Sequence, residues 1–487
     1  MSDRDFTLRL GRRTLGRRAV SLVALTAALA LIGGGGSLLG AESATNSASR
    51  VALVGRTTNV CTVSKDEDTR TSVAAVAVRR EPERRGELRA EPLSGGEAEL
   101  ELTEQGKGET LAQPDGSVLI SADGAMATGA SAAVLGTATT GDQAGLMAAP
   151  CSAPTTVHWF PGVGTGDTDK TQLILTNPDD AQAVVDLRFF GRRGRVAVPG
   201  SPNIAVAGRS TRTLSISALV QTEGPLSVAV RTSSGRIAAV ARELRRFKGE
   251  PAGADWQLGA APPAASVIIP AVPDGDGVRR LVVTNPGTVR AAVTISALGI
   301  QGEFAPSGAE SLDLEPESTA EVDLTAGLAG EPGAIKLSSD QPVTGAVLST
   351  ARRESAQGDV AIQSAAIPLV RDGVSAIATA DGTDSDLILT NGSDVDTPVT
   401  FEVFSFAGVS LRTDDVLLAA NTTATRRITS PSPSYVVVRV PQGSGVYGGI
   451  RLAQPEGDVA GLATIPLTSP DVASRAPVPV PDPAIGR

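Results

Sequence analysis

The chain has 487 residues, which gives room for three or four domains, and its 53 acidic and 43 basic residues leave a formal net charge of −10. An acidic chain disfavours a nucleic-acid partner, because phosphate backbones are held by clustered Lys and Arg. One histidine and two cysteines provide few ligands for a zinc site and few candidates for histidine-dependent catalysis. Aromatic residues are only 3% of the chain, so its cores are expected to contain small and β-branched side chains, which suit strands.

The first 50 residues predict a segment that targets the membrane. Residues 1–18 carry a cluster of arginines, and residues 19–39 form a long apolar run, which fits a transmembrane signal anchor or a signal peptide. The positive-inside rule places the basic tail in the cytoplasm and everything after the apolar run outside. We therefore expect a single-pass protein of the cell membrane with an extracytoplasmic C-terminal region, or a secreted protein cleaved near Ala41. Residues 40–50 are expected to be a linker.

A short strand-and-turn motif of the form Leu-x-(Leu/Val)-Thr-Asn occurs three times. The asparagines are Asn177, Asn285 and Asn391, and a glycine follows each after 17 residues: Gly194, Gly302 and Gly408. The asparagines lie 108 and 106 residues apart. A fixed period with a fixed internal offset indicates repeated modules.

Around these motifs, apolar and polar residues alternate at period two between Gly, Pro and Asp, which predicts short antiparallel strands. Modules of about 100 residues with six or seven strands suggest immunoglobulin-like or fibronectin-like β-sandwiches. The predicted fold class is therefore all-β, with tandem sandwiches after one N-terminal transmembrane helix. The expected parts are a divergent β-sandwich at 51–156, further β-sandwiches at 157–264, 265–364 and 365–468, and a disordered Pro-rich tail at 469–487.

Cys61 and Cys151 lie near the two ends of the first module. Thiols oxidise outside the membrane, so we expect one disulfide between them. The alternative is two independent buried thiols.

The repeated asparagines are interpreted as turn residues, because an Asn side chain can bond the backbone two residues further on. The alternative is three copies of a ligand site. The glycines that follow are expected to be hairpin residues with positive φ.

Acidic residues cluster before each motif strand: Asp167 and Asp169; Asp274 and Asp276; Asp381, Asp384 and Asp386. Clustered carboxylates can hold calcium. None of the loops matches an EF-hand, so solvated turns are expected, and neither a metal site nor a cofactor is predicted. Another set of acids lies in turns after the last hairpin of each copy: Asp142, Asp255, Asp359 and Asp458.

The single histidine, His158, lies beside Trp159. Alignment of the copies on Pro161, Pro270, Pro368 and Pro466 places both residues at ordinary strand positions. Trp159 is therefore expected in a core, and no catalytic residue is predicted.

The run from His158 to Thr165, the Leu-x-Leu-Thr-Asn-Pro turns and the stretch Gly253–Trp256 together resemble an uncharacterised family of exported actinobacterial proteins, classed as a domain of unknown function. The resemblance covers roughly residues 50–470. It implies a single-pass or secreted envelope protein and supplies no activity. The third turn departs from the pattern, because Gly392 stands where the other two have proline.

The expected function is that of a non-enzymatic, envelope-anchored or secreted β-sandwich protein, serving outside the membrane as a scaffold or partner-binding module. Its partner would be an envelope protein or a cell-wall glycan. The alternative is a cell-wall or polysaccharide-binding accessory protein of envelope assembly. Sugar sites usually contain exposed aromatic side chains, and the candidates lie in the last module: Phe401, Phe404, Phe406, Tyr435 and Tyr447.

Overall fold

The computed structural model describes residues 49–63, 68–80, 85–166, 169–247, 249–352, 356–377, 382–430, 433–470 and 473–477. They form two units, of which the smaller is built on β1 (Ser49–Leu53) and β35 (Ala473–Pro477), paired in a two-stranded sheet. β35 lies in the expected disordered tail, so that expectation is wrong for these residues. The predicted membrane segment lies outside the described residues, and no helix within the described ranges is long and apolar enough to cross a membrane.

The larger unit runs from Leu53 to Ala473 and contains four successive sets of strands, called modules 1 to 4 below. Module 1 contains β2 (Arg56–Cys61), β3 (Thr69–Ala77), β4 (Gly86–Pro92), β5 (Leu100–Leu102), β6 (Gly108–Ala112), β7 (Val118–Gly124), β8 (Ala130–Ala138) and β9 (Gly145–Pro150). Module 2 contains β10 (Val157–Val163), β11 (Lys170–Asn177), β12 (Ala183–Gly191), β13 (Gly194–Val196), β14 (Ile204–Val206), β15 (Ser210–Ser215), α2 (Ile216–Leu219), β16 (Leu226–Ser234), β17 (Ala238–Phe247) and β18 (Glu250–Leu258).

Modules 3 and 4 follow the same plan. Module 3 contains β19 (Ala264–Val272), β20 (Arg279–Asn285), β21 (Ala291–Gly299), β22 (Gly302–Phe304), β23 (Ser311–Leu314), β24 (Ser318–Asp323), α3 (Thr325–Leu328), β25 (Gly333–Ala351) and β26 (Asp359–Ser364). Module 4 contains β27 (Asp372–Ile377), β28 (Asp384–Asn391), β29 (Thr397–Ser405), β30 (Ser410–Leu418), β31 (Thr423–Ile428), β32 (Ser434–Arg439), β33 (Val446–Ala453) and β34 (Leu462–Pro466).

Each module is a sandwich of two antiparallel sheets with the same strand order. In module 4 the sheets are β27-β32-β29-β30 and β31-β28-β33-β34, and in module 1 they are β2-β7-β4-β5 and β6-β3-β8-β9. In module 3 the first half of β25 pairs with β19 and β21, whereas its second half pairs with β20 and β26. One continuous strand therefore belongs to both sheets of that module.

This strand order corrects the immunoglobulin-like or fibronectin-like expectation. In the immunoglobulin sandwich the first strand pairs with the second and the seventh with the sixth. Here the first strand pairs with the sixth and the seventh with the second, as β27 with β32 and β33 with β28. The reason is that the chain crosses to the opposite sheet after the sixth strand, as β25 does without a break. The all-β sandwich class is confirmed, and its topology is different.

The repeated motif supplies the core of each module through alternation along one strand. In β11, Leu173 and Leu175 are fully buried in the core of module 2. Leu281 and Val283 of β20 are likewise fully buried in the core of module 3. Because successive strand residues point to opposite faces, two apolar residues two apart are enough to fix which face is buried.

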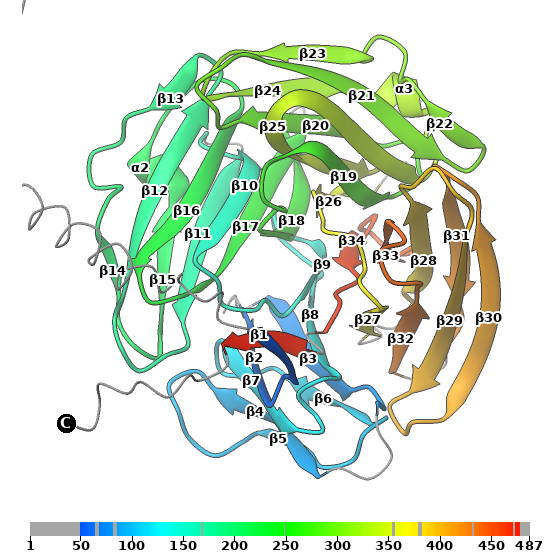
Figure 1. Ribbon diagram of the computed structural model, residues 1–487. Coiled ribbons are helices and arrows are strands. Elements are labelled where there is room, and N and C mark those ends of the chain that lie inside the picture. The colour runs from blue at the N-terminus through cyan, green and yellow to red at the C-terminus, as the bar shows by residue number, and fades with distance from the viewer. Residues whose placement is uncertain are drawn as a thin grey trace, which may run out of the picture. The chain divides into compact units, whose positions relative to one another are not determined.

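The four modules form a closed ring around a central hub (Figure 1). The hub consists of the last strand of each module: β9, β18, β26 and β34. β18 packs on β9 and β26, and β34 packs on β26 and β9, so module 4 also meets module 1. The larger unit is therefore one body in which every module touches at least two others, unlike a row of independent sandwiches.

Similar hydrogen bonds join neighbouring modules away from the hub. The Thr319 hydroxyl of module 3 donates to the Phe190 carbonyl of module 2 at 2.8 Å. The Thr423 hydroxyl of module 4 donates to the Leu298 carbonyl of module 3 at 2.7 Å. Both threonines pair with the threonine of the motif strand, so they occupy equivalent positions.

One buried carboxylate joins the modules at the hub. Asp359 is fully buried, and its Oδ2 accepts backbone N–H groups from Leu146 of module 1 at 2.8 Å and Leu462 of module 4 at 2.7 Å. Its Oδ1 accepts the N–H of Val360 at 2.9 Å. Burial raises the pKa of Asp359 well above its usual range, although the backbone donors act in the opposite direction.

The strand register shows why this position is occupied by aspartate in a single module. Pairing with the preceding strand makes Asp359 equivalent to Gly145, Gly253 and Gly461. A Cβ atom at Gly145 or Gly253 would lie 2.3 or 2.0 Å from the Asp359 carboxylate group. The centre therefore has room for one side chain. The turn acids Asp142 and Asp458, which the sequence grouped with Asp359, are instead exposed.

A second buried carboxylate lies nearby. Asp255 accepts the N–H of Ala148 in module 1 at 3.3 Å and the N–H of Ile362 in module 3 at 3.0 Å. It is fully buried as well. Edge strands have unpaired backbone groups, and these two carboxylates satisfy such groups on three of the four hub strands.

We predict that Asp359→Asn destabilises the larger unit by about 3 kcal/mol, because the amide has one acceptor oxygen and would direct its NH₂ group at a backbone N–H. Chemical denaturation of the full-length protein measures this. Asp458→Asn is the control, since Asp458 is an exposed turn acid. Equal stability of the two variants would contradict the role given to Asp359.

Candidate functional site

A cavity of about 760 Å³ lies where the four modules meet. Four residues in its lining occupy equivalent positions on the hub strands: Ala148, Trp256, Ile362 and Thr464. We call these four residues the floor of the cavity. The same structural position thus contributes four different side chains, although the backbone around it is repeated.

The walls come from the segments that leave each hub strand. A proline lines the cavity six residues after each floor residue: Pro154, Pro262, Pro368 and Pro470. Proline restricts φ and has no N–H, so these segments are stiff and add few polar groups to the wall.

The sequence alignment on prolines was wrong for two of its members. Pro161 and Pro270 lie in the first strands of modules 2 and 3, whereas Pro466 lies in the last strand of module 4 and Pro368 in a connection between modules. Short Ala- and Pro-rich stretches match one another at several offsets, and strand pairing removes that ambiguity.

The cavity lining is apolar with a basic bias. Alanine and proline are its most frequent residues, and it includes no Asp or Glu. Its charged residues are Arg56 and Arg236. Arg236 is held by Asp179, with both nitrogen–oxygen distances 2.9 Å. Arg56 is exposed and has no ion pair or hydrogen bond to its side chain among the described residues.

Most of the lining's buried polar side chains are already paired. Gln363 accepts the Ser349 hydroxyl at 2.7 Å and donates to Thr464 Oγ1 at 2.9 Å. The Ser364 hydroxyl donates to the Leu258 carbonyl at 2.8 Å. Two lining residues are exceptions in the described part of the chain. The Trp256 indole N–H has no acceptor although the residue is 2% exposed, and the buried Ser152 hydroxyl has no partner either.

His158 lines the same cavity from β10. Its Nε2 lies 3.0 Å from the Ile237 carbonyl oxygen and 3.1 Å from Thr155 Oγ1. Burial lowers the pKa of His158, and the polar neighbours oppose that change. The ring therefore carries no charge at neutral pH.

We predict that the His158 imidazole titrates below the ordinary histidine pKa of about 6.5. The unfolded chain gains this proton first as pH falls, so this histidine lowers the free energy of unfolding from pH 6.5 down to its folded-state pKa. Since the chain has one histidine, NMR of its imidazole gives the pKa without assignment. His158→Gln should remove the pH dependence that this histidine gives to the free energy of unfolding. A pKa at or above 6.5 would contradict the burial argument.

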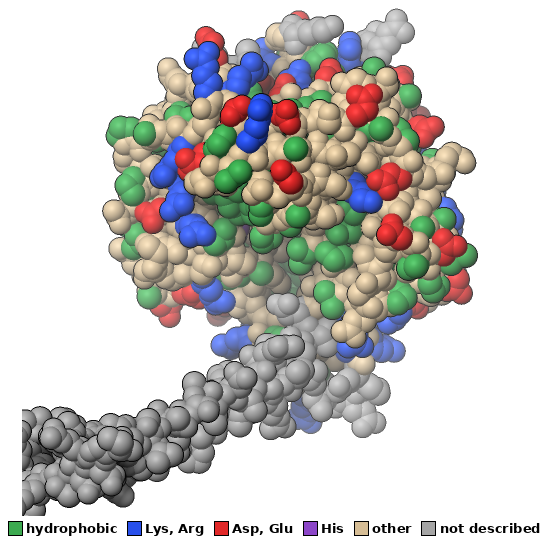
Figure 2. Space-filling model, turned by 45° about the horizontal axis from the view of Figure 1, so that its top comes forward, with side chains coloured by type: hydrophobic (Ala, Val, Ile, Leu, Met, Phe, Trp, Pro, Cys, Tyr) green, Lys and Arg blue, Asp and Glu red, His purple; other side chains and the backbone are tan. Residues whose placement is uncertain are grey.

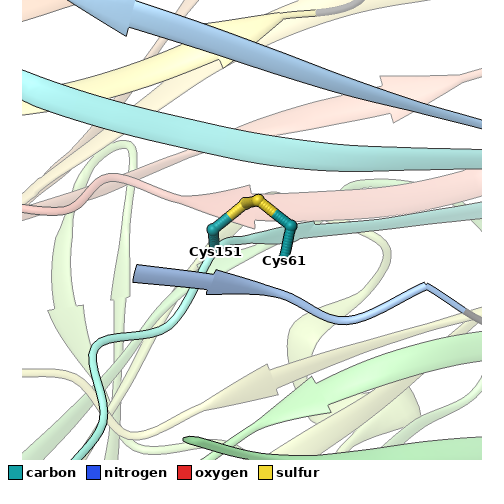
Figure 3. Close-up of a disulfide and its surroundings, with 2 residues drawn as sticks. All are labelled: Cys61 and Cys151. Atoms are coloured by element: carbon teal, nitrogen blue, oxygen red, sulfur yellow. A yellow bond between two sulfur atoms is a disulfide. The ribbon is translucent and has the colours of Figure 1, made fainter. Parts of the chain in front are cut away.

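Cys61 and Cys151 form a disulfide with an S–S distance of 2.03 Å (Figure 3). It links β2 to the residue after β9, and Cys151 lines the cavity. Next to it, Val60 and Ser152 exchange two backbone hydrogen bonds of 2.9 Å. The disulfide therefore fixes the first wall segment to module 1.

We predict that Cys61→Ser with Cys151→Ser lowers the free energy of unfolding by about 4 kcal/mol, because the bond closes a long loop; the sequence separation is 90 residues. Denaturation of oxidised and reduced protein tests the same effect without substitution. An unchanged midpoint after verified reduction would show that the disulfide adds no stability.

The repeated asparagines are turn residues in the structure. Asn177 Oδ1 accepts the Asp179 N–H at 3.1 Å, and its amide donates to the Ala181 and Val206 carbonyls. Asn285 and Asn391 make corresponding bonds to Gly287 and Ser393, two residues further on. All three side chains are buried, so their polar groups are used inside the fold.

The following glycines have the positive φ angles expected of them. The values are 121° at Gly194, 137° at Gly302 and 81° at Gly408. Each lies at the end of a turn between paired strands, where a side chain would strain the backbone.

The acidic loops are organised by arginines. In module 3, the buried Arg279 guanidinium donates to the carbonyls of Pro273, Asp274 and Gly275, which a cation would otherwise use. Burial lowers the pKa of Arg279 to about 10. In module 4, Asp386 pairs with Arg427 and Arg451.

The remaining acids of these loops do not gather into a metal site within the described ranges. Asp169 accepts the Arg246 N–H, and Asp384 pairs with Arg427. Asp167 and Asp381 lie outside the described residues, among which no three potential metal ligands lie together.

The aromatic residues considered for sugar binding are used in packing. Phe401 and Tyr435 are buried in a hydrophobic core cluster that modules 1 and 4 share, and Phe404 stacks on Tyr435 with ring centroids 5.1 Å apart. The Tyr435 hydroxyl donates to the Gly106 carbonyl of module 1 at 2.9 Å. Phe406 packs on the same core, and Tyr447 packs against apolar residues of module 3.

The two tryptophans also lie between modules. Trp159 is half-buried against the core of module 3, and its ring centroid lies 5.8 Å from that of Phe190. Trp256 is part of the core of module 1. Sequence reasoning placed Trp159 in a core, but it could not show that the core belongs to the next module.

Comparison with known proteins gives a family and no activity. The model of a family described as a "Family of unknown function (DUF5719)" matches residues 103–429. No curated protein matches the chain. Among solved structures, the Streptomyces avermitilis α-L-rhamnosidase complexed with L-rhamnose is 10% identical, with a TM-score of 0.13. That match covers 84% of this chain and 55% of the enzyme, and its low score supports no argument about fold or function.

Proposed function

The chain belongs to the DUF5719 family of unknown function, and we propose that it is a non-enzymatic binding protein that works outside the membrane as a rigid scaffold. The uncharacterised family expected from the sequence is thereby confirmed, whereas its export and its actinobacterial origin remain part of the proposal. The observation that supports binding is the hub cavity, which all four modules line and in whose lining Ala and Pro are the most frequent residues. Concave, largely apolar sites with a few polar groups are typical of ligand pockets.

The arrangement of the acids supports the absence of an enzyme active site. Asp255 and Asp359 come from different modules, as the two carboxylates of a glycosidase could. Both are fully buried, their oxygens accept backbone N–H groups, and neither lines the cavity. A carboxylate that substrate cannot reach is a structural group, and His158 is likewise bonded to its own module.

The surface charge favours a protein or small-ligand partner over nucleic acid. Acidic and basic side chains are interspersed over the face seen in Figure 2, with apolar side chains between them. Nucleic-acid binding needs a basic patch or stripe. The membrane segment at residues 19–39, retained or cleaved near Ala41, would place the ring in the cell envelope.

The polysaccharide-binding alternative loses its main support. The five aromatic side chains considered for it are buried or half-buried, either in a core or against a neighbouring module, and none forms an exposed stacking platform. We therefore keep wall polymers as a test ligand and do not propose them as the partner.

We predict that the immobilised full-length protein retains a component of a membrane-protein fraction and that isolated cell-wall polymers do not sediment it. Mass spectrometry identifies what is retained, and Asp359→Asn, which loosens the hub, should reduce retention. Asp458→Asn is the matched control. Saturable hydrolysis of any envelope polymer by the purified protein would contradict the non-enzymatic proposal.

A further inference from the structure

We propose that the hub cavity binds a single-chain amphiphile with an anionic head group. This inference rests on the proposed binding function and adds the chemical class of the ligand. It combines four observations on the cavity: its lining, its size, its charge and its place along the chain.

The apolar part of the ligand matches the floor and walls. Ala148, Trp256 and Ile362 supply three of the four floor positions, and the wall segments add alanine and proline. Ile367, on the wall between modules 3 and 4, is 67% exposed although it is a large apolar residue. Such a surface favours an alkyl chain, because it removes the methylene groups of the chain from water.

The size suits one alkyl chain. The volume of about 760 Å³ lies within the range of about 300–1,000 Å³ of small-molecule pockets. It lies among four stiff, proline-containing segments, so a flexible chain can fill it whereas a folded partner cannot enter.

Charge and hydrogen bonding select the head group. The chain carries a net charge of −10, yet the lining includes no acid and includes Arg56, whose guanidinium has no partner among the described residues. Guanidinium binds phosphate and carboxylate in a planar, two-bond geometry. Arg56 is exposed whereas Trp256 is 2% exposed, so the anion would lie at the open side of the cavity and the apolar chain at its floor.

The place of the cavity along the chain supports a lipid source. Val54 and Pro470 both line it, so the first and last segments of the larger unit leave from its wall. Fourteen residues, and therefore fifteen Cα-to-Cα steps, lie between Leu39, the end of the predicted membrane segment, and Val54. Their fully extended length is at most about 54 Å, which would keep the cavity close to the membrane surface if the segment is retained.

The test uses full-length protein with Trp159→Phe, so that Trp256 is the sole tryptophan reporter. Dodecyl phosphate, dodecyltrimethylammonium and dodecyl maltoside have the same chain with anionic, cationic and neutral head groups, and each is titrated below its micelle concentration. We expect a saturable change in Trp256 fluorescence and in the His158 imidazole resonance with dodecyl phosphate, and binding at least tenfold weaker for the cationic probe.

Two variants separate the two parts of the site. Arg56→Gln should weaken dodecyl phosphate at least tenfold and leave dodecyl maltoside unchanged, whereas Arg195→Gln, an exposed arginine outside the cavity lining, should change neither. Ala153→Phe, which places a ring at an exposed position of the lining, should weaken all probes. Ala205→Phe, at an exposed position of β14 outside the cavity lining, is its control.

The outcomes distinguish this inference from the proposed function. Equal binding of the anionic and cationic probes, or no binding of any probe, overturns the amphiphile. A saturable change in Trp256 fluorescence with a proline-rich peptide, and none with dodecyl phosphate, would assign the cavity to a peptide. If a membrane protein is captured equally well by Ala153→Phe, the scaffold function stands while its location in the cavity is overturned.

Discussion

The ring depends on one buried carboxylate. Asp359 bonds backbone N–H groups of modules 1, 3 and 4, and it lies against Gly253 of module 2. Four strand edges meet at this point, and three of them direct backbone donors to Asp359 that would otherwise be left unpaired in the interior. A single acceptor group with several lone pairs satisfies donors from different modules and thereby fixes their relative positions. Removing it would leave unpaired groups in the interior and a space in the middle of the hub.

The same position explains how four repeats form an asymmetric centre. Equivalent residues would place four side chains in one small volume, and three of them are glycine. The floor of the cavity has diverged in the same way, to Ala, Trp, Ile and Thr. The repeated features, such as the Asn turns and the motif strands, maintain the fold of each module. The features that occur once lie on the common axis, and this is where we place function.

Closure of the ring also changes the environment of many side chains, and with it their role. Trp159, Tyr435 and Tyr447 would be surface aromatics on isolated sandwiches, but here each packs on a neighbouring module. In module 4 the clustered aspartates that could hold calcium are instead paired with Arg427 and Arg451. The cavity exists because proline-containing connections surround the hub strands without filling the space above them.

The sequence by itself determined what depends on neighbouring residues. Period-two alternation predicted strands, and the 106- and 108-residue spacing predicted repeated modules. Asn177, Asn285 and Asn391 could be interpreted as turn residues, because each side-chain oxygen accepts a backbone N–H from the residue two positions further on. Only the tertiary structure decided the exchange of strands between sheets, the closure of the ring, and the separation of Asp359 from the exposed Asp142 and Asp458. These depend on register and on contacts between residues more than 100 positions apart, such as Asp359 with Leu146. Patterns of neighbouring residues do not reveal such contacts, because the groups that make them meet only when the four modules close into a ring.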